Sequence, residues 1–188
     1  DVGCAEGGLT TAFGDALGLA PENVHGCDVL AAPSSPGFTY AAARSESLPY
    51  RDEQFQVVTF IMSLHHLKDL RSSLAEALRV LAPGGVLAIR EHDCPSRHYG
   101  AYLDIVHFLY AAVVNDEITL RPGRETEDFE DQRELLTSDF RTKASWSEAI
   151  TAAGFTYLCT CEPTIVDRRG RRQNRPDMYN SYYAFYRK

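Results

Sequence analysis

The strongest constraint on the fold is an alternation of short apolar runs with helical patterns in the first half of the chain. The run Gln56–Met62 is almost entirely apolar, as expected of a strand covered on both faces. A helical pattern follows, which Asp69 can cap and which Pro83-Gly84-Gly85 is predicted to stop. Val86–Ile89 is then the next buried strand. Strands and helices alternating in this way predict βαβ units and a mostly parallel sheet covered by helices.

The remaining elements fit one domain over residues 1–188. Asp1-Val2-Gly3-Cys4 resembles the end of a strand whose start is absent from the chain. Residues 94–144 are too long for a plain connection and are predicted to be an inserted lid or acceptor-binding region. A capping box at Ser145–Glu148 predicts a helix that Gly154 ends. The other predicted elements are helices at Leu9–Leu17 and His98–Asn115 and strands at Asn23–Asp28, Phe38–Ala43, Tyr157–Cys161 and Tyr179–Tyr186.

Composition and charge exclude several classes of protein. The chain has 188 residues, 44% of them hydrophobic, and no apolar run approaches the roughly 20 residues of a membrane helix. Its net charge of -7 argues against general coating of a nucleic-acid backbone. Its five cysteines form no C-x-x-C pair, which favours reduced thiols and a cytoplasmic location.

A glycine-rich turn, Asp1–Gly8, lies between the first strand and the first helix. Gly3 and Gly7 allow a tight bend and close approach of a ligand to the backbone. The turn lacks the Gly-Lys-Ser/Thr of a phosphate-binding Walker loop and the middle glycine of a dinucleotide-binding turn. Asp28 ends the second strand, where a carboxylate can accept hydrogen bonds from both hydroxyls of a ribose.

Further motifs follow this turn in a fixed order: Glu46–Tyr50, Phe55–Val58, Ser63–Leu67 and Leu78–Gly85. Together they resemble the class I S-adenosylmethionine-dependent methyltransferases, especially the group with L-P-F, F-D-x-V, L-H-H and R-V-L-x-P-G-G motifs. The resemblance covers the first half of the chain strongly and the closing strands more weakly. It implies a Rossmann-like α/β fold: a mostly parallel seven-stranded sheet with a C-terminal antiparallel hairpin. The cofactor would lie across the carboxyl edge of that sheet.

Carried over by position, the resemblance also implies the residues that contact S-adenosylmethionine. The methionine part would be lined by Asp1, Gly3, Cys4, Ala5 and Gly7. Asp28 would hold the ribose with Val29 beside the adenine, Ser45 and Glu46 would lie in the adenine loop, and Ser63 and Leu64 would pass beneath the sulfonium. The chain departs from the family at Arg44, where an adenine-binding Asp is frequent, at Gln56, which replaces a common Asp, and at Ala5 within the turn.

Candidate catalytic residues follow the two strands at the centre of the predicted sheet. These residues are His65, His66, Glu91, His92 and Asp93. Histidine suits a base that deprotonates an acceptor, since its reference pKa is about 6.5. Alternatively, one histidine of the pair packs or caps a turn.

The predicted helix His98–Asn115 offers further candidates. Asp104 and His107 lie on the side away from its apolar stripe and could complete an acceptor pocket with Tyr99 or Tyr110, or could face solvent as a pair. Glu91, His92, Asp93, Asp104 and His107 include the ligand types of a metal site. No spacing enforces such a site, and we predict none.

These observations lead to a prediction of methyl transfer from S-adenosylmethionine to an O or N atom of a small molecule. An RNA methyltransferase acting on a cap or a tRNA, such as a domain of a viral protein, is the first alternative. Residues 168–188 hold seven basic residues and one acid, and Arg168, Arg169, Arg171 and Arg172 could bind an RNA backbone. A degenerate fold that only binds or scaffolds is the second alternative.

Overall fold

The computed structural model describes residues 1–30, 37–113, 138–162, 165–166, 172–173 and 180–188. Its α-helices are α1 (Gly8–Ala16), α2 (Leu70–Val80), α3 (Arg97–Val113) and α5 (Lys143–Ala152), and its 3₁₀ helices are η1 (Pro21–Asn23) and η2 (Leu64–His66). Its strands are β1 (His25–Asp28), β2 (Thr39–Ala42), β3 (Phe55–Ile61), β4 (Leu81–His92), β5 (Thr156–Cys161), β6 (Ile165–Val166), β7 (Arg172–Gln173) and β8 (Ser181–Arg187).

The strands form a mostly parallel arrangement with an antiparallel end, as predicted. The central sheet has the order β3-β4-β8-β5, in which β3 and β4 are parallel and β8 is antiparallel to both of its neighbours. β1 and β2 form a parallel pair beside it. Val2 connects the two sheets, because it bridges to Cys27 and its N–H donates to the carbonyl of Thr59 at 2.9 Å. The seven-strand count remains a prediction, since this single bridge stands at the position of the first strand.

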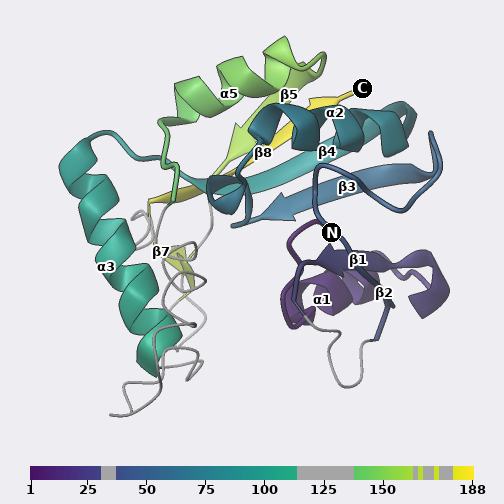
Figure 1. The fold of residues 1–188 in the computed structure, drawn as a ribbon, viewed down its shortest axis with the longest axis horizontal. Coiled ribbons are helices and arrows are strands. Elements are labelled where there is room, and N and C mark those ends of the chain that lie inside the picture. The colour runs from purple at the N-terminus through teal and green to yellow at the C-terminus, as the bar shows by residue number, and fades with distance from the viewer. Residues whose placement is uncertain (31–36, 114–137, 163–164, 167–171, 174–179) are drawn as a thin grey trace.

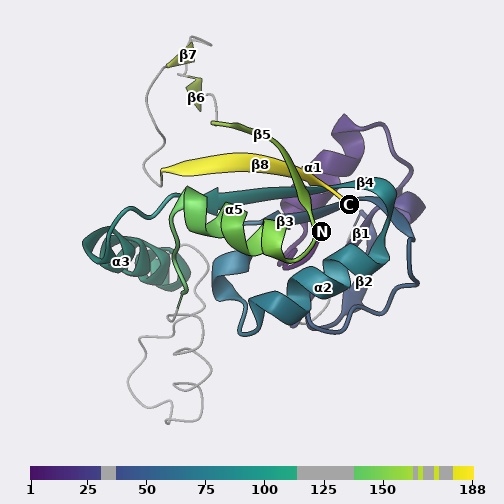
Figure 2. The same ribbon diagram turned by 90° about the horizontal axis from the view of Figure 1, so that it is seen from above.

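Helices lie on both sides of the sheets. α2 and α5 lie on one face and α1 on the opposite side, while α3 lies beyond the carboxyl ends of β3 and β4 (Figures 1 and 2). The core is made of fully buried apolar side chains such as Phe60, Leu74, Leu87, Trp146 and Ile150. Because each helix buries only one stripe, this packing fixes the positions of the strand ends, where the candidate residues lie.

Two helix boundaries differ from the predictions because of specific contacts. α2 ends at Val80, before the predicted Pro-Gly-Gly stop, because Leu81 already pairs with Phe55 in the parallel ladder of β3 and β4. α5 is capped by Thr142, whose hydroxyl accepts from the Ser145 N–H at 3.1 Å, so the predicted capping box at Ser145–Glu148 was wrong. The cap at Asp69 is confirmed, since its carboxylate accepts from the Ser72 N–H at 3.0 Å.

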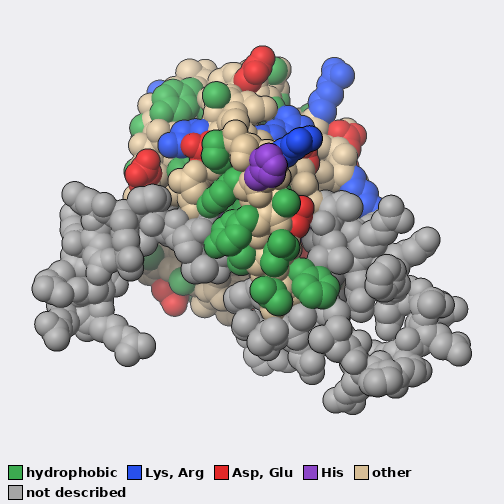
Figure 3. Space-filling view, turned by 90° about the vertical axis from the view of Figure 1, so that its left-hand side faces the viewer, with side chains coloured by type: hydrophobic (Ala, Val, Ile, Leu, Met, Phe, Trp, Pro, Cys, Tyr) green, Lys and Arg blue, Asp and Glu red, His purple; other side chains and the backbone are tan. Residues whose placement is uncertain are grey.

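The helix α3 exposes much of its apolar stripe. Tyr102, Ile105 and Leu109 are 40%, 59% and 52% exposed, while Leu103 is fully buried. Hydrophobic side chains accordingly gather over this helix in the space-filling view (Figure 3). The inward side of the helix carries His107 instead, whose ring lies against those of His65 and His92. Within the described ranges, no helix has the length and apolarity needed to cross a membrane.

Candidate active site

The turn between Asp1 and α1 is closely packed and depends on its glycines. Gly3 and Gly7 have φ angles of +76° and +74°, a region that residues with a Cβ rarely adopt. A Cβ on Gly7 would lie 2.1 Å from the Phe38 ring, and one on Gly3 would lie 2.5 Å from the Cβ of Ser63. Ala5 also adopts a positive φ, of +45°, so three of the first seven residues have a left-handed backbone conformation. Glycine is therefore required here by both conformation and space.

The carboxylate of Asp28 ties the end of β1 to this turn. Its Oδ2 accepts from the Ala5 N–H at 2.8 Å and its Oδ1 accepts from the Leu30 N–H at 3.1 Å. A carboxylate has about four acceptor positions, so two remain for other donors. Asp28 is only partly buried, which leaves these positions accessible. These acceptor positions therefore fit the predicted role of binding the two hydroxyls of a ribose.

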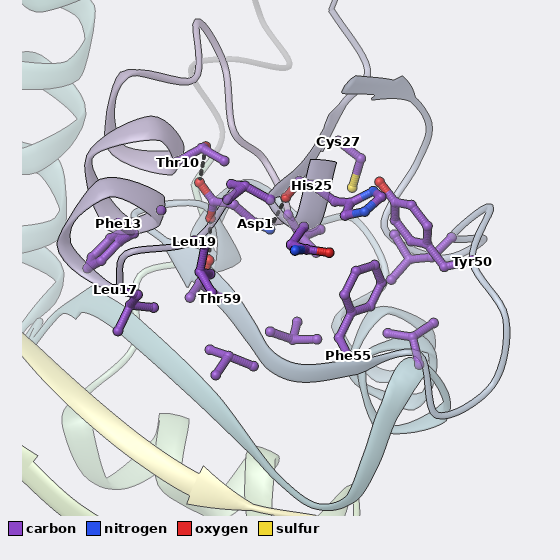
Figure 4. A pocket seen from close by; sticks show the side chains of 18 residues that line it. Asp1, Thr10, Phe13, Leu17, Leu19, His25, Cys27, Tyr50, Phe55 and Thr59 are labelled. Carbon is purple, nitrogen blue, oxygen red and sulfur yellow. Dashed lines mark hydrogen bonds between the residues drawn. The ribbon is translucent and has the colours of Figure 1, made fainter. Parts of the chain in front are cut away.

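Asp1 lies behind the turn. Its carboxylate accepts hydrogen bonds from the hydroxyls of Thr10 at 2.7 Å and Thr59 at 2.6 Å (Figure 4). A mainly apolar cavity of about 100 Å³ lies next to it, lined among others by Phe13 and Tyr50. Binding sites for small molecules usually measure about 300 to 1,000 Å³, so this cavity is too small for a nucleoside cofactor. Asp1 thus supports the turn from behind.

The other predicted cofactor residues lie at the same edge but are engaged in different ways. The hydroxyl of Ser63 donates to the Val2 carbonyl at 2.7 Å, and Leu64 is buried beside it. The hydroxyls of Ser45 and Ser73 lie 2.8 Å apart. Nε of Arg44 lies 3.4 Å from Oε2 of Glu46. The positive charge of Arg44, which departs from the family, is therefore paired within the loop. Val29 is exposed. Their contacts to a cofactor remain predictions.

Four histidines meet beyond the carboxyl ends of β3 and β4. We call His65, His66, His92 and His107 the histidine cluster. His65 and His66 belong to η2, His92 ends β4, and His107 comes from α3. The centroid of the His65 ring lies 4.1 Å from that of His66, 5.2 Å from that of His92 and 5.1 Å from that of His107. The Nε2 atoms of His92 and His107 lie 3.2 Å apart.

A fully buried carboxylate orients the first of these histidines. Oε2 of Glu91 lies 2.7 Å from Nδ1 of His65, and the two side chains are 0% and 1% exposed. The same carboxylate accepts from the backbone N–H groups of His65 at 3.4 Å and His92 at 3.3 Å. Burial raises the pKa of Glu91 to about 7 and lowers the pKa of His65 to about 3. Burial also lowers the pKa of His107 to about 3, followed by the effect of its histidine neighbours. These imidazoles are therefore uncharged at neutral pH.

Phe140 covers the histidine cluster on one side. Its ring stacks on His65 with 5.2 Å between centroids, and the neighbouring Asp139 N–H donates to the His65 carbonyl at 2.8 Å. On the far side of Phe140 lies an open hollow of about 560 Å³, lined also by Asp104 and Arg141. Within the described residues, Oδ1 of Asp104 is buried without a hydrogen-bond partner, and burial raises the pKa of this carboxyl. The hollow has the volume of a small-molecule site.

Not every predicted acceptor or catalytic residue joins the histidine cluster. Oδ1 of Asp93 accepts from the Lys143 N–H at 2.8 Å, so this carboxylate holds the start of α5. Tyr99 packs on Tyr102 with 5.6 Å between ring centroids. Several predicted residues lie outside the described part of the chain. They are residues 114–137 of the predicted lid, Arg168, Arg169, Arg171 and the side chains of Tyr110 and Arg172.

Sequence reasoning missed two contacts that shape the site. Phe38 packs against Gly7 and Gly26, and Phe140 covers the histidines. Phe140 follows His107 only after a long segment. No local pattern therefore identifies it as a neighbour of the histidine cluster.

Comparison with known proteins finds sequence relatives of the first half of the chain. Residues 1–89 match the family described as a methyltransferase domain. The ubiquinone/menaquinone biosynthesis C-methyltransferase UbiE of Shewanella piezotolerans is 37% identical over 68 residues, which cover 34% of this chain and 27% of that protein. The match thus spans about a quarter of the relative's length.

Solved structures agree over the whole fold. A SAM-dependent methyltransferase of Methanosarcina mazei covers 100% of this chain and 90% of its own, with a TM-score of 0.62 at 17% identity. The 1,6-didemethyltoxoflavin-N1-methyltransferase of Burkholderia thailandensis, solved with S-adenosylhomocysteine, covers 100% of this chain and 69% of its own, with a TM-score of 0.60 at 16% identity. These likenesses confirm the predicted Rossmann-like fold, and the match over residues 1–89 agrees with the predicted methyltransferase family.

Proposed function

We propose that this chain, whose residues 1–89 belong to the methyltransferase-domain family, transfers a methyl group from S-adenosylmethionine to an O or N atom of a small-molecule acceptor. The observation that carries the proposal is the joining of the glycine turn to Asp28 through the Ala5 N–H at 2.8 Å. This junction lies at the carboxyl edge of the parallel strands, which is where open α/β sheets bind their ligands. The fold neighbours support the choice of cofactor.

The residues of the turn and β1 suit this cofactor. S-adenosylmethionine supplies a methyl group on a positively charged sulfur. The two remaining acceptor positions of Asp28 can receive the ribose hydroxyls, and the exposed start of α1 places first-turn amides beside the turn. Gly3 and Gly7 keep the backbone bend free of side chains. These residues bind and orient, and none of them has to change its covalent state.

The acceptor would enter from the hollow beside Phe140 and meet the histidine cluster. When the acceptor O or N bonds to the methyl carbon, the bond between that carbon and the sulfur breaks, S-adenosylhomocysteine leaves, and the acceptor's proton must be released. An imidazole of the cluster can take that proton, and the Glu91 carboxylate, whose Oε2 lies 2.7 Å from Nδ1 of His65, orients the His65 ring. The carboxyl of Asp104, which lines the hollow, offers a polar contact that can orient the acceptor.

The oxidation state of the cysteines bears on the cellular compartment of the protein. All five are free, and Cys159 and Cys161 are exposed on β5. Exposed unpaired thiols favour a reducing compartment, so we place the reaction in the cytoplasm.

The test is transfer of a labelled methyl group. The protein is incubated with S-adenosylmethionine that carries a ¹³C- and ³H-labelled methyl, together with either a small-molecule extract or total RNA. We expect label in the small-molecule fraction and a ¹³C shift typical of an O- or N-methyl. Label in RNA alone would overturn the proposal, and a C-methyl product would correct the acceptor atom toward that of UbiE. Cofactor binding without transfer to either pool would favour a binding module.

A further inference from the structure

Three members of the histidine cluster are arranged as ligands of one ion. We propose that His65, His66 and His107 bind a divalent transition-metal ion such as Zn²⁺. One ring nitrogen from each of the three lies within 4.8 Å of the others. Imidazole nitrogens bound to one tetrahedral zinc at 2.0 to 2.1 Å lie about 3.4 Å apart. Small rotations of the rings are therefore enough to close the site.

The strongest sign of a ligand is the orientation of His65. Its Nδ1 is engaged by Glu91 at 2.7 Å, which leaves Nε2 as the only free ring nitrogen. Within the described residues this Nε2 is buried without a hydrogen-bond partner, although the His65 side chain is only 1% exposed. A buried polar atom without a partner is costly, and such groups call for an explanation. A carboxylate on one nitrogen and a metal on the other is the usual arrangement of a metal-binding histidine.

The types of ligand decide which metal the site would take. Imidazole suits zinc, copper, iron and nickel, whereas magnesium and calcium prefer oxygen ligands. The carboxylate of Glu91 is occupied by His65 and backbone N–H groups, so it orients the ligand rather than binding the metal. Three protein ligands leave a fourth tetrahedral position open, as in catalytic zinc sites. A water or an oxygen of the acceptor could take that position.

This site differs from the combination of metal-ligand types found in the sequence. Asp93 holds the start of α5, and Glu91 faces His65, so neither is a direct ligand here. Only the tertiary structure brings His107 to the histidine pair. The inference deepens the proposed function, since the ion would lie beside the acceptor hollow. With the ion bound, the ring nitrogens of His65, His66 and His107 hold the metal, so a hydroxide formed from the metal-bound water would take the acceptor's proton in place of an imidazole. Metal binding itself depends only on the described side chains.

The test is titration of the metal-free protein with Co²⁺, a coloured probe for zinc sites. The protein carries no polyhistidine tag and is first stripped with a chelator. We expect one Co²⁺ per chain with the strong visible absorption of a tetrahedral ion, displacement by Zn²⁺, and no competition by Mg²⁺. His66→Ala alters an exposed residue and should fold normally. It should weaken binding at least about tenfold and abolish the absorption, and His107→Ala should do the same.

Two further variants make the result specific. His98→Ala removes an exposed histidine from the same helix as His107 and should bind Co²⁺ as the wild type does. Glu91→Gln should weaken binding by about 10- to 100-fold while keeping the tetrahedral spectrum, because it removes the carboxylate that orients His65. Circular dichroism confirms that each variant is folded.

Absence of stoichiometric Co²⁺ binding would overturn the inference, as would wild-type binding by both His66→Ala and His107→Ala. The readout needs neither cofactor nor acceptor. Co²⁺ binding without methyl transfer would therefore refute only the proposed function, and methyl transfer without Co²⁺ binding would refute only the metal site.

Discussion

The glycine turn and the histidine cluster lie at the same edge of the sheet but are built in different ways. The turn is one continuous segment, Asp1–Gly7, and Asp28 accepts a hydrogen bond from its Ala5 N–H. The histidine cluster draws on η2, β4, α3 and the segment that contains Phe140. A site made from one bend depends on backbone conformation, whereas a site made from several elements depends on how those elements pack.

The two carboxylates show the same contrast. Asp28 is partly accessible and keeps acceptor positions for a ligand, while Glu91 is fully buried and serves His65 and two backbone N–H groups. We therefore expect loss of Glu91 to affect mainly stability and loss of Asp28 to affect mainly affinity for the cofactor.

Replacement of Glu91 should have the largest effect. Glu91→Ala removes the acceptor shared by Nδ1 of His65 and two backbone N–H groups. We expect the free energy of unfolding to fall by about 3–5 kcal/mol, because each buried donor that loses its acceptor costs about 1–3 kcal/mol. Urea denaturation measures the change. Glu148→Ala, on the exposed side of α5, is the control and should stay within about 0.5 kcal/mol of the wild type. A loss below about 1 kcal/mol for Glu91→Ala would show that water forms hydrogen bonds to these groups. It would contradict the expectation that Glu91 acts mainly on stability.

A methyl group in the glycine turn should come next. Gly7→Ala must adopt a positive φ and place its Cβ 2.1 Å from the Phe38 ring. Strain and overpacking together should cost about 2–4 kcal/mol of unfolding free energy. The adjacent Gly8→Ala is a matched control, because nothing lies within 4 Å of the position that its Cβ would take and it begins α1. That variant should be neutral or slightly stabilising in the same thermal or urea melts. Equal destabilisation by the two variants would contradict the packing argument.

Replacement of Asp28 should separate affinity from stability. Asp28→Ala removes the acceptors for the ribose, and we expect the affinity for S-adenosylmethionine to fall by about 1.5–3 kcal/mol, or roughly 10- to 150-fold. Isothermal titration calorimetry measures this change. Asp15→Ala, an exposed aspartate on α1, should leave the affinity unchanged. Unchanged affinity in Asp28→Ala would mean that the ribose lies elsewhere.

The smallest effect is expected from the arginine-rich segment. The combined change of Arg168, Arg169, Arg171 and Arg172 to alanine should leave methyl transfer to the small-molecule acceptor within about twofold of the wild type, because a small acceptor has no phosphate backbone for these arginines to bind. The labelled-methyl assay checks this. Loss of transfer together with loss of RNA binding would favour the RNA alternative instead.

Much of the fold was predictable because its signals are local. The apolar run at Gln56–Met62 and the cap at Asp69 each specify an element from a few neighbouring residues, and β3 and α2 follow them closely. Gly3 and Gly7 in the first turn adopt a positive φ, a conformation that glycine accepts without stabilisation by a distant contact. Helix ends were less predictable, since the pairing of Leu81 with Phe55 ends α2 early.

The sequence by itself determined the alternation of strands and helices, the glycine turn and the placing of His65, His66 and Glu91 at neighbouring strand ends. Hydrophobic periodicity and backbone conformation depend on a few neighbouring residues, so they can be recognised in the sequence. Only the tertiary structure decided that His107 faces inward while Ile105 and Leu109 face outward, and that Phe140 covers the histidines. A helix that is apolar nearly all round has no unique buried side, so the packing of elements distant in sequence selects the side that completes the site.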